Sequence, residues 1–162
     1  MFQFLPSRLK SLRLAAGLAV TISIAALSGT ALAQEMSSDD NVLVTNVVQT
    51  YFDGYAAGDT TKLATVFHRD FHLSWVDPFT RPGRSPFKQV DRKGLFRFFG
   101  PNWSTQYKVE SELISVETDG DAATAKALVS LVGIVEWTDY LSLLKIDGKW
   151  WIVAKISKGK RL

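Results

Sequence analysis

Two apolar runs near the end of the chain constrain its fold more than any other feature. They span residues 140–146 and 150–155, and Asp147-Gly148 lies between them. An Asp-Gly pair between apolar runs is a strong hairpin signal, because glycine adopts the positive φ that a tight turn requires. The chain is therefore expected to end in a long antiparallel strand pair.

The first part of the chain has the pattern of a secretory signal peptide. Arg8, Lys10 and Arg13 precede an apolar segment at about 14–27, and Ala31-Leu32-Ala33 follows. The segment is shorter than the roughly 20 apolar residues of a membrane span. We expect cleavage after Ala33, a periplasmic or secreted protein and no stable membrane anchor; an uncleaved anchor is the alternative.

Charge and cysteine content narrow the class of the mature protein. Three of the 19 basic residues and none of the 16 acidic residues lie in the signal segment, so cleavage lowers the net charge from +3 to zero. A neutral chain gives no support for binding nucleic acid. There is no cysteine, so the hydrophobic core rather than a disulfide must stabilise the exported domain. We expect a flexible segment at 34–40 and one domain at 41–162.

Helical patterns occupy the first half of that domain. Apolar residues recur at three- and four-residue spacing from Val44 to Tyr55, with Asp40 or Asn41 as the expected N-cap and Gly58 as the stop. Asp59 is expected to cap a short second helix whose inner side carries Leu63, Val66 and Phe67. Asp91 is expected to cap a third helix, at about 91–99.

Strand patterns dominate the remainder. Phe71, Leu73, Trp75 and Asp77 share one face of the first strand, and a Pro/Gly-rich loop follows it. Four long strands are predicted at 107–117, 122–135, 137–146 and 149–157. Helices first and strands last predict an α+β fold, in which a curved antiparallel sheet wraps over three helices and leaves a cone-shaped cavity.

Three segments resemble the nuclear transport factor 2-like superfamily of cone-shaped α+β barrels. They are 51–59, 67–70 and 139–150. Within the superfamily they are most similar to the putative lumazine-binding (SnoaL-like) group. The fold hosts isomerases, dehydratases, binding modules and docking domains, so it does not determine function by itself.

The first helix is also similar to that of bacterial ketosteroid isomerases. That resemblance implies an oxyanion-hole tyrosine at Tyr51 and a general base at Asp77, which precedes Pro78. Aligning the last hairpin places Ser142 where those enzymes carry a further acid. Both site residues have a structural alternative: Asp77 can cap the turn before the loop, and Tyr51 can be a core aromatic.

Other polar residues give weaker signals. His68 and His72 are the only histidines, and they do not have the spacing of a zinc site, so we expect no metal and no cofactor. The loop and third helix carry a basic cluster that either guides an anionic ligand or is simply solvated: Arg81, Arg84, Lys88, Arg92, Lys93 and Arg97. Neighbouring tryptophans on the strands predict an aromatic outer sheet face suited to homodimerisation.

Three functions follow as alternatives. The first is an exported protein that binds a small apolar or planar molecule in its cavity, with Tyr51, Phe71, Trp75, Tyr140 and Ser142 as ligand-binding residues. The second is a proton-transfer enzyme, isomerase- or dehydratase-like, that uses Asp77 and Tyr51. The third is a non-catalytic dimerisation or docking module.

Overall fold

The computed structural model describes the backbone of residues 24–162 and the side chains from Asp39 onward. Most of the predicted signal peptide, residues 1–23, lies outside the described residues, and its cleavage stays a prediction. The predicted flexible segment at 34–40 is helical here and belongs to the first helix; its mobility after cleavage is untested. Among residues 24–162, no helix is long and apolar enough to span a membrane.

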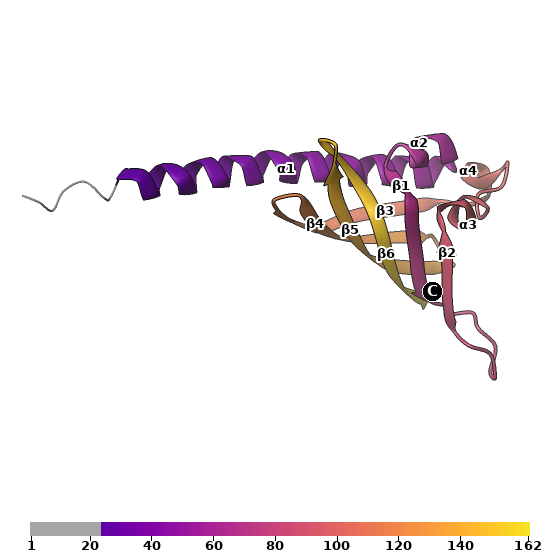
Figure 1. The fold of residues 1–162 in the computed structure, drawn as a ribbon. Coiled ribbons are helices and arrows are strands. Elements are labelled where there is room, and N and C mark those ends of the chain that lie inside the picture. The colour runs from indigo at the N-terminus through magenta and orange to yellow at the C-terminus, as the bar shows by residue number, and fades with distance from the viewer. Residues whose placement is uncertain (1–23) are drawn as a thin grey trace, which may run out of the picture.

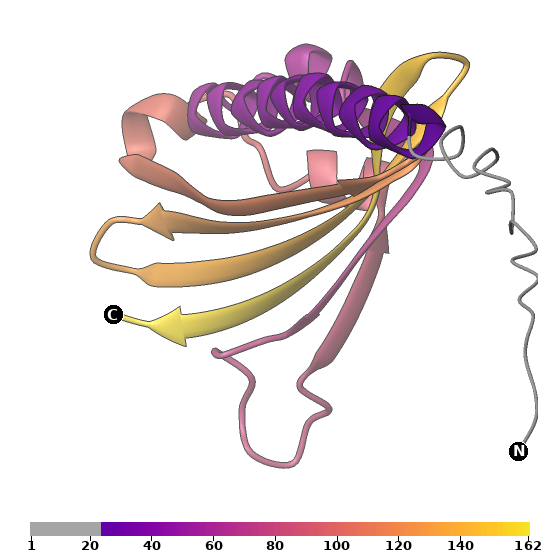
Figure 2. The ribbon, with the colours of Figure 1, turned by 90° about the vertical axis from the view of Figure 1, so that its left-hand side faces the viewer.

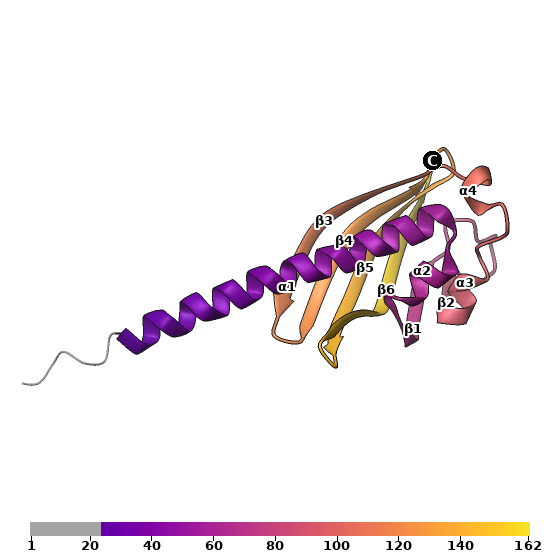
Figure 3. The same ribbon diagram turned by 90° about the horizontal axis from the view of Figure 1, so that it is seen from above.

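Helix α1, Ile24–Ala57, is the longest element; its C-terminal part lies across one face of the sheet, and its N-terminal part projects beyond the sheet (Figures 1 and 3). The predicted cap at Asp40 or Asn41 is wrong, because the helix continues through both residues. The predicted end is confirmed: Gly58 has φ +67°, and the Asp59 N–H donates to the Gly54 carbonyl at 2.9 Å. This left-handed glycine and its hydrogen bond form a Schellman-type terminus, which ends α1 and leads directly into the second helix.

The other helices are short and gather near the C-terminal end of α1 (Figure 1). They are α2, Thr60–Ala64; α3, Arg92–Phe96; and α4, Trp103–Gln106. Two predicted caps are confirmed, since Asp59 accepts from the Lys62 N–H at 2.9 Å and Asp91 from the Gly94 N–H at 2.7 Å. The second helix is shorter than predicted, because Phe67 already belongs to the first strand.

Six strands in residues 24–162 form one sheet in the order β2-β1-β6-β5-β4-β3. β1 and β6 run parallel, and every other neighbouring pair is antiparallel. The bounds are β1, Phe67–Val76; β2, Phe87–Asp91; β3, Val109–Asp119; β4, Ala122–Leu131; β5, Val135–Ile146; and β6, Lys149–Arg161. The sequence did not predict β2, an edge strand with no fully buried residue and hence no apolar alternation.

The terminal hairpin forms as its sequence predicts. Asp147 and Gly148 have φ of 51° and 75°, and Ile146 pairs with Lys149 across the turn. Two consecutive positive φ values are typical of a tight hairpin turn whose twist matches that of the strands. Register shifts interrupt three of the strand pairs, and bulges of this kind bend a sheet.

The curved sheet closes partly around α1, which confirms the predicted cone-like α+β fold (Figure 2). The core lies between the helix and the concave face of the sheet. Its largest fully buried side chains are Tyr51, Phe67, Phe71, Leu63, Leu141, Leu143 and Ile152. The convex face carries exposed residues, and the cone remains open at the end opposite the terminal hairpin.

Asp40 connects α1 to the terminal hairpin through two hydrogen bonds. Its Oδ1 accepts from the Lys145 Nζ at 2.9 Å and from the Trp150 Nε1 at 3.0 Å. The hydrogen bonds from Lys145 and Trp150 lower the pKa of the Asp40 carboxyl. The contact explains why an acidic residue stands within the helix, where the sequence suggested only a cap.

We expect Asp40→Asn to weaken the domain most near neutral pH. Because folding lowers the pKa of Asp40, its contribution is present above the unfolded value of about 3.9 and is lost as the pH falls through the folded value. Urea unfolding of both chains from about pH 7 to about pH 3 should show the stability gap closing toward acid. Asp53→Asn, at an exposed carboxylate on α1, is the control; a constant gap would contradict the assignment.

Candidate functional site

An apolar cavity of about 370 Å³ lies at the open end of the cone. Residues of α1, α3, α4, the loop after β1 and four strands line it. Six of its aromatic residues are Tyr55, Trp75, Phe98, Trp103, Tyr107 and Trp137. The volume falls within the range of about 300–1,000 Å³ that is typical of small-ligand pockets.

Aromatic contacts hold the cavity wall in shape. The Trp103 Nε1 donates to the Tyr55 carbonyl at 2.7 Å, and the two rings meet edge to face at 5.5 Å. Trp75 meets Phe98 edge to face at 6.0 Å. Such edge-to-face pairs add stabilisation beyond the burial of their area, so these rings have few alternative positions.

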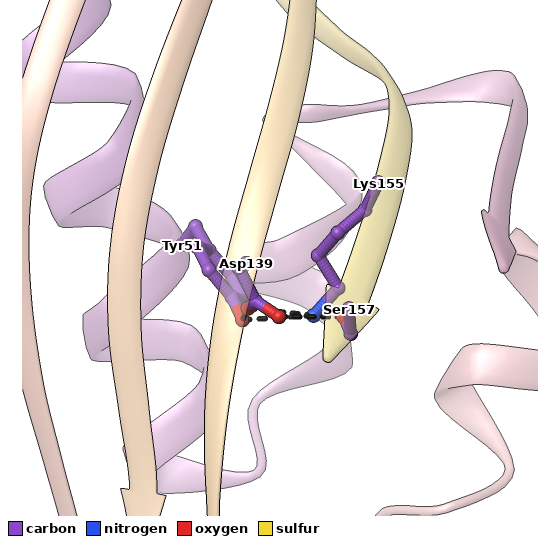
Figure 4. Close-up of polar contacts among 4 residues, drawn as sticks. All are labelled: Tyr51, Asp139, Lys155 and Ser157. Atoms are coloured by element: carbon purple, nitrogen blue, oxygen red, sulfur yellow. Dashed lines mark hydrogen bonds and ion pairs between the residues drawn. The ribbon is translucent and has the colours of Figure 1, made fainter. Parts of the chain in front are cut away.

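A cluster of four polar residues connects α1, β5 and β6 (Figure 4), and two of its members lie at the inner end of the cavity. The Tyr51 hydroxyl donates to Asp139 Oδ2 at 2.6 Å, and Lys155 Nζ donates to the same oxygen at 3.0 Å and to the Tyr51 hydroxyl at 2.9 Å. Ser157 Oγ donates to Asp139 Oδ1 at 2.5 Å. Lys155 and Ser157 also line the cavity, so one side of this cluster faces the space that a ligand would occupy.

Strand register brings these side chains together. Asp139 of β5 pairs directly with Ser157 of β6, and Lys155 lies two residues earlier on β6. Residues two apart share one face of a strand, so both β6 side chains point to the concave side. Tyr51 reaches the cluster from the buried face of α1. The four residues form a direct polar link between the helix and the centre of the sheet.

Burial governs the electrostatics of the cluster. Asp139 and Tyr51 are fully buried, and Lys155 is 4% exposed. A buried ion pair needs good geometry and further hydrogen bonds to offset the lost hydration of both charges. The three donors on Asp139 meet that requirement. Burial, and after it the negative charge of Asp139, raises the pKa of Tyr51 well above its usual value, so Tyr51 remains a donor.

The predicted ligand-binding residues have different positions. Trp75 lies in the cavity wall. Phe71 and Tyr51 are core residues, and the ring of Phe71 lies 4.5 Å from that of Phe67. Tyr140 and Ser142 are exposed on the convex face of β5 and do not line the cavity, so the structure gives no support to their predicted ligand-binding role. Strand alternation gives the reason, because the inward residues of β5 are the odd-numbered ones.

Asp139 is the main residue that sequence reasoning missed. Placing Ser142 at the position of an acid suggested that the site had no carboxylic acid, whereas Asp139 contacts Tyr51 directly. Alternation was the signal that could have found it. Leu141 and Leu143 are core residues, and Asp139 lies two residues before Leu141 on the same face.

Asp77 caps a turn. Its Oδ1 accepts from the Phe79 N–H at 3.0 Å, and its Oδ2 accepts from the Thr80 hydroxyl at 3.0 Å. This is the Asx-type role that the sequence left open. No hydrogen bond links Asp77 to Tyr51 in the described part of the chain. The contacts therefore favour the structural alternative for Asp77, while its catalytic role remains an untested prediction.

The remaining polar candidates also have local roles. The Arg92 guanidinium of the basic cluster donates to the Phe67 carbonyl at 3.1 Å, whereas Arg81, Arg84 and Lys88 are exposed. His68 Nδ1 accepts from the Asp70 N–H at 3.2 Å within β1. Between residues 39 and 162, no group of three histidine or acidic side chains is arranged to hold a metal ion.

We expect the Tyr51 hydroxyl to stabilise the domain below about pH 10 and to lose this contribution at higher pH. Folding raises the pKa of Tyr51, so the unfolded chain releases the phenolic proton first, at about pH 10, and stability falls above that value. In urea unfolding, the stability gap between the parent chain and Tyr51→Phe should narrow from about pH 9 to about pH 11. Tyr140→Phe, at an exposed tyrosine, should leave the pH profile unchanged. A gap that widens with pH would contradict the prediction.

Comparison with known proteins supports the architecture. A family model described as putative lumazine-binding matches residues 39–157. No curated protein sequence matches the chain. An NTF2-like protein of unknown function from Shewanella baltica OS155 has 20% identity and a TM-score of 0.63 over 77% of this chain and 97% of that one.

Two further solved structures have similar folds. An NTF2-like protein of unknown function from Methylobacillus flagellatus KT has 22% identity and a TM-score of 0.60 over 89% of this chain and 99% of that one. A ketosteroid isomerase-like protein from Erwinia carotovora atroseptica has 14% identity and a TM-score of 0.55 over 76% and 98%. At these identities the likeness establishes the NTF2-like fold alone.

Proposed function

Because the chain belongs to the putative lumazine-binding family, we propose that it binds a small, planar or apolar molecule in its cone cavity. The aromatic cavity of about 370 Å³ is the observation that carries the proposal. Flat rings suit walls built from edge-to-face aromatic pairs, because they gain contact area without displacing these side chains. The description of the family points to the same class, since lumazine is a planar bicyclic heterocycle.

A ligand-binding role accounts for the contacts of Asp77 and Tyr51 better than a proton-transfer role does. The Asp77 carboxylate is engaged in a turn, and the Tyr51 hydroxyl is hydrogen-bonded within the buried cluster. A general base must lie within hydrogen-bond reach of the reacting proton. Neither predicted catalytic group lines the cavity. A ligand-binding role requires only the cavity and its polar inner end.

We expect Ile134→Trp to block ligand binding. Ile134 is 41% exposed and lines the cavity, so a larger side chain there should obstruct its mouth without disturbing the core. Affinity for lumazine and for naphthalene, measured by tryptophan fluorescence and by native mass spectrometry, should fall at least about tenfold.

Thr61→Trp is the matched control, since it adds the same side chain at an exposed position of α2 that does not line the cavity. It should leave both affinities unchanged. Equal loss in the two variants would point to a general disturbance of the fold. Tight binding that survives Ile134→Trp would place the ligand outside the cavity and contradict the proposal.

We further propose that the protein acts after export, as a homodimer that pairs through the convex sheet face. The signal-peptide pattern supports export. Exposed apolar side chains on β5 and β6 support pairing: Tyr140, Leu144 and Ile156 are 47%, 42% and 62% exposed. Large apolar residues grouped on one sheet face are typical of an interaction surface.

We expect Ile156→Lys to convert a dimer to a monomer. The substitution places a charge at the most exposed of these apolar positions, where pairing would bury it without a partner. Sedimentation velocity across a concentration series measures the change. Phe87→Lys, at a similarly exposed residue on the edge strand β2, is the control. A parent chain that stays monomeric throughout the series would contradict dimerisation.

A further inference from the structure

We propose that the cavity selects a neutral planar ligand with a carbonyl group, and that Lys155 donates a hydrogen bond to the carbonyl oxygen. The inference rests on the proposed binding function and names the chemistry of its ligand. It starts from the one charged side chain that both belongs to the polar cluster and lines the cavity.

Lys155 has one N–H that the cluster does not use. An ammonium group has three donors. Two are directed to the Tyr51 hydroxyl and to Asp139 Oδ2, and the third has no hydrogen-bond partner among residues 39–162. A buried donor is well placed only where it meets an acceptor. A ligand oxygen at the inner end of the cavity would provide one.

The charge of the cluster favours a neutral acceptor. Lys155 is already paired with the Asp139 carboxylate at 3.0 Å, so their charges cancel. A ligand carboxylate on Lys155 would place a second negative charge close to Asp139, in a region where both are shielded from water. Like charges repel strongly in such a medium. A carbonyl oxygen accepts the hydrogen bond without adding a charge.

Ser157 supplies a complementary acceptor. Its hydroxyl hydrogen is directed to Asp139 Oδ1, which leaves the lone pairs of its oxygen available. Ser157 lies two residues from Lys155 on the same face of β6, and both line the cavity. The inner end therefore offers one donor and one acceptor side by side. A cyclic amide, with its carbonyl beside an N–H, matches both groups.

The rest of the cavity limits the ligand to an otherwise apolar body. Apart from aromatic side chains, the other lining residues are leucine, isoleucine and valine. Polar groups on the ligand that reach neither the hydroxyl groups of Tyr55 and Tyr107 nor the inner end would lose water without gaining partners. The cavity therefore fits a ligand that has one polar edge, which lies at the inner end, and an apolar remainder, which lies toward the mouth.

Three bicyclic aromatic probes of similar size test the inference. Carbostyril is a neutral lactam, naphthalene has no polar group, and naphthoate is an anion. The parent chain should bind carbostyril about tenfold more tightly than naphthalene, which is the roughly 1.4 kcal/mol that one additional buried hydrogen bond is expected to contribute. Naphthoate should bind more weakly than carbostyril. Isothermal titration and native mass spectrometry measure the affinities.

The variant Lys155→Met should lose the preference for carbostyril and keep its affinity for naphthalene. Removal of Lys155 leaves Asp139 as a buried, unpaired carboxylate, which can prevent folding. The double variant Asp139→Asn/Lys155→Met removes both charges. The new amide oxygen can accept from one of the two hydroxyl groups, Tyr51 or Ser157, and the amide NH2 can donate to the oxygen of the other. Lys145→Met, at the lysine paired with Asp40, is the control and should retain the preference.

The outcomes separate this inference from the proposed function. Equal affinity for carbostyril and naphthalene in the parent chain would overturn the role of Lys155 and leave cavity binding intact. Tighter binding of naphthoate than of carbostyril would overturn the neutral ligand. Failure of all three probes to bind would contradict the proposed function itself. A carbostyril preference that survives in the double variant would assign carbonyl recognition to another residue.

Discussion

The buried ion pair between Asp139 and Lys155 is the interaction on which the rest of the structure depends. It joins the two central strands of the sheet, and the Tyr51 hydroxyl connects both charges to α1. Neither charge can be left alone in this position without a large loss of stability. The pair therefore specifies which face of the helix meets the sheet, and it fixes the inner wall of the cavity at the same time.

A second polar contact determines over what length α1 packs against the sheet. Asp40 connects α1 to Lys145 and Trp150 at the terminal hairpin, three turns before Tyr51 meets the ion pair. Two fixed points along one helix determine its direction as well as its contact face. The apolar residues between them fill the closed end of the cone. Beyond Tyr51 the core is not filled, and the aromatic residues around Tyr55 surround the cavity instead.

Patterns of local origin were predictable from the sequence, and patterns that depend on distant partners were not. The Asp147-Gly148 turn and the helix stop at Gly58 follow from backbone conformations that glycine favours, and both form as expected. The edge strand β2 has no apolar alternation and needs β1 to define it. The position of Ser142 was inferred by aligning a hairpin, and an odd offset along a strand reverses every side chain. That reversal hid Asp139.

The same ion pair explains how one cluster can serve both stability and recognition. An unpaired lysine at the inner end of the cavity would attract any small anion. The positive charge of Lys155 is balanced by the negative charge of Asp139, and Lys155 can still donate a hydrogen bond. Three donors hold the carboxylate in place, so the lysine has a fixed position before a ligand arrives. A donor that is already ordered loses little entropy on binding. The residues that hold α1 against the sheet thereby prepare the inner end of the cavity for a ligand.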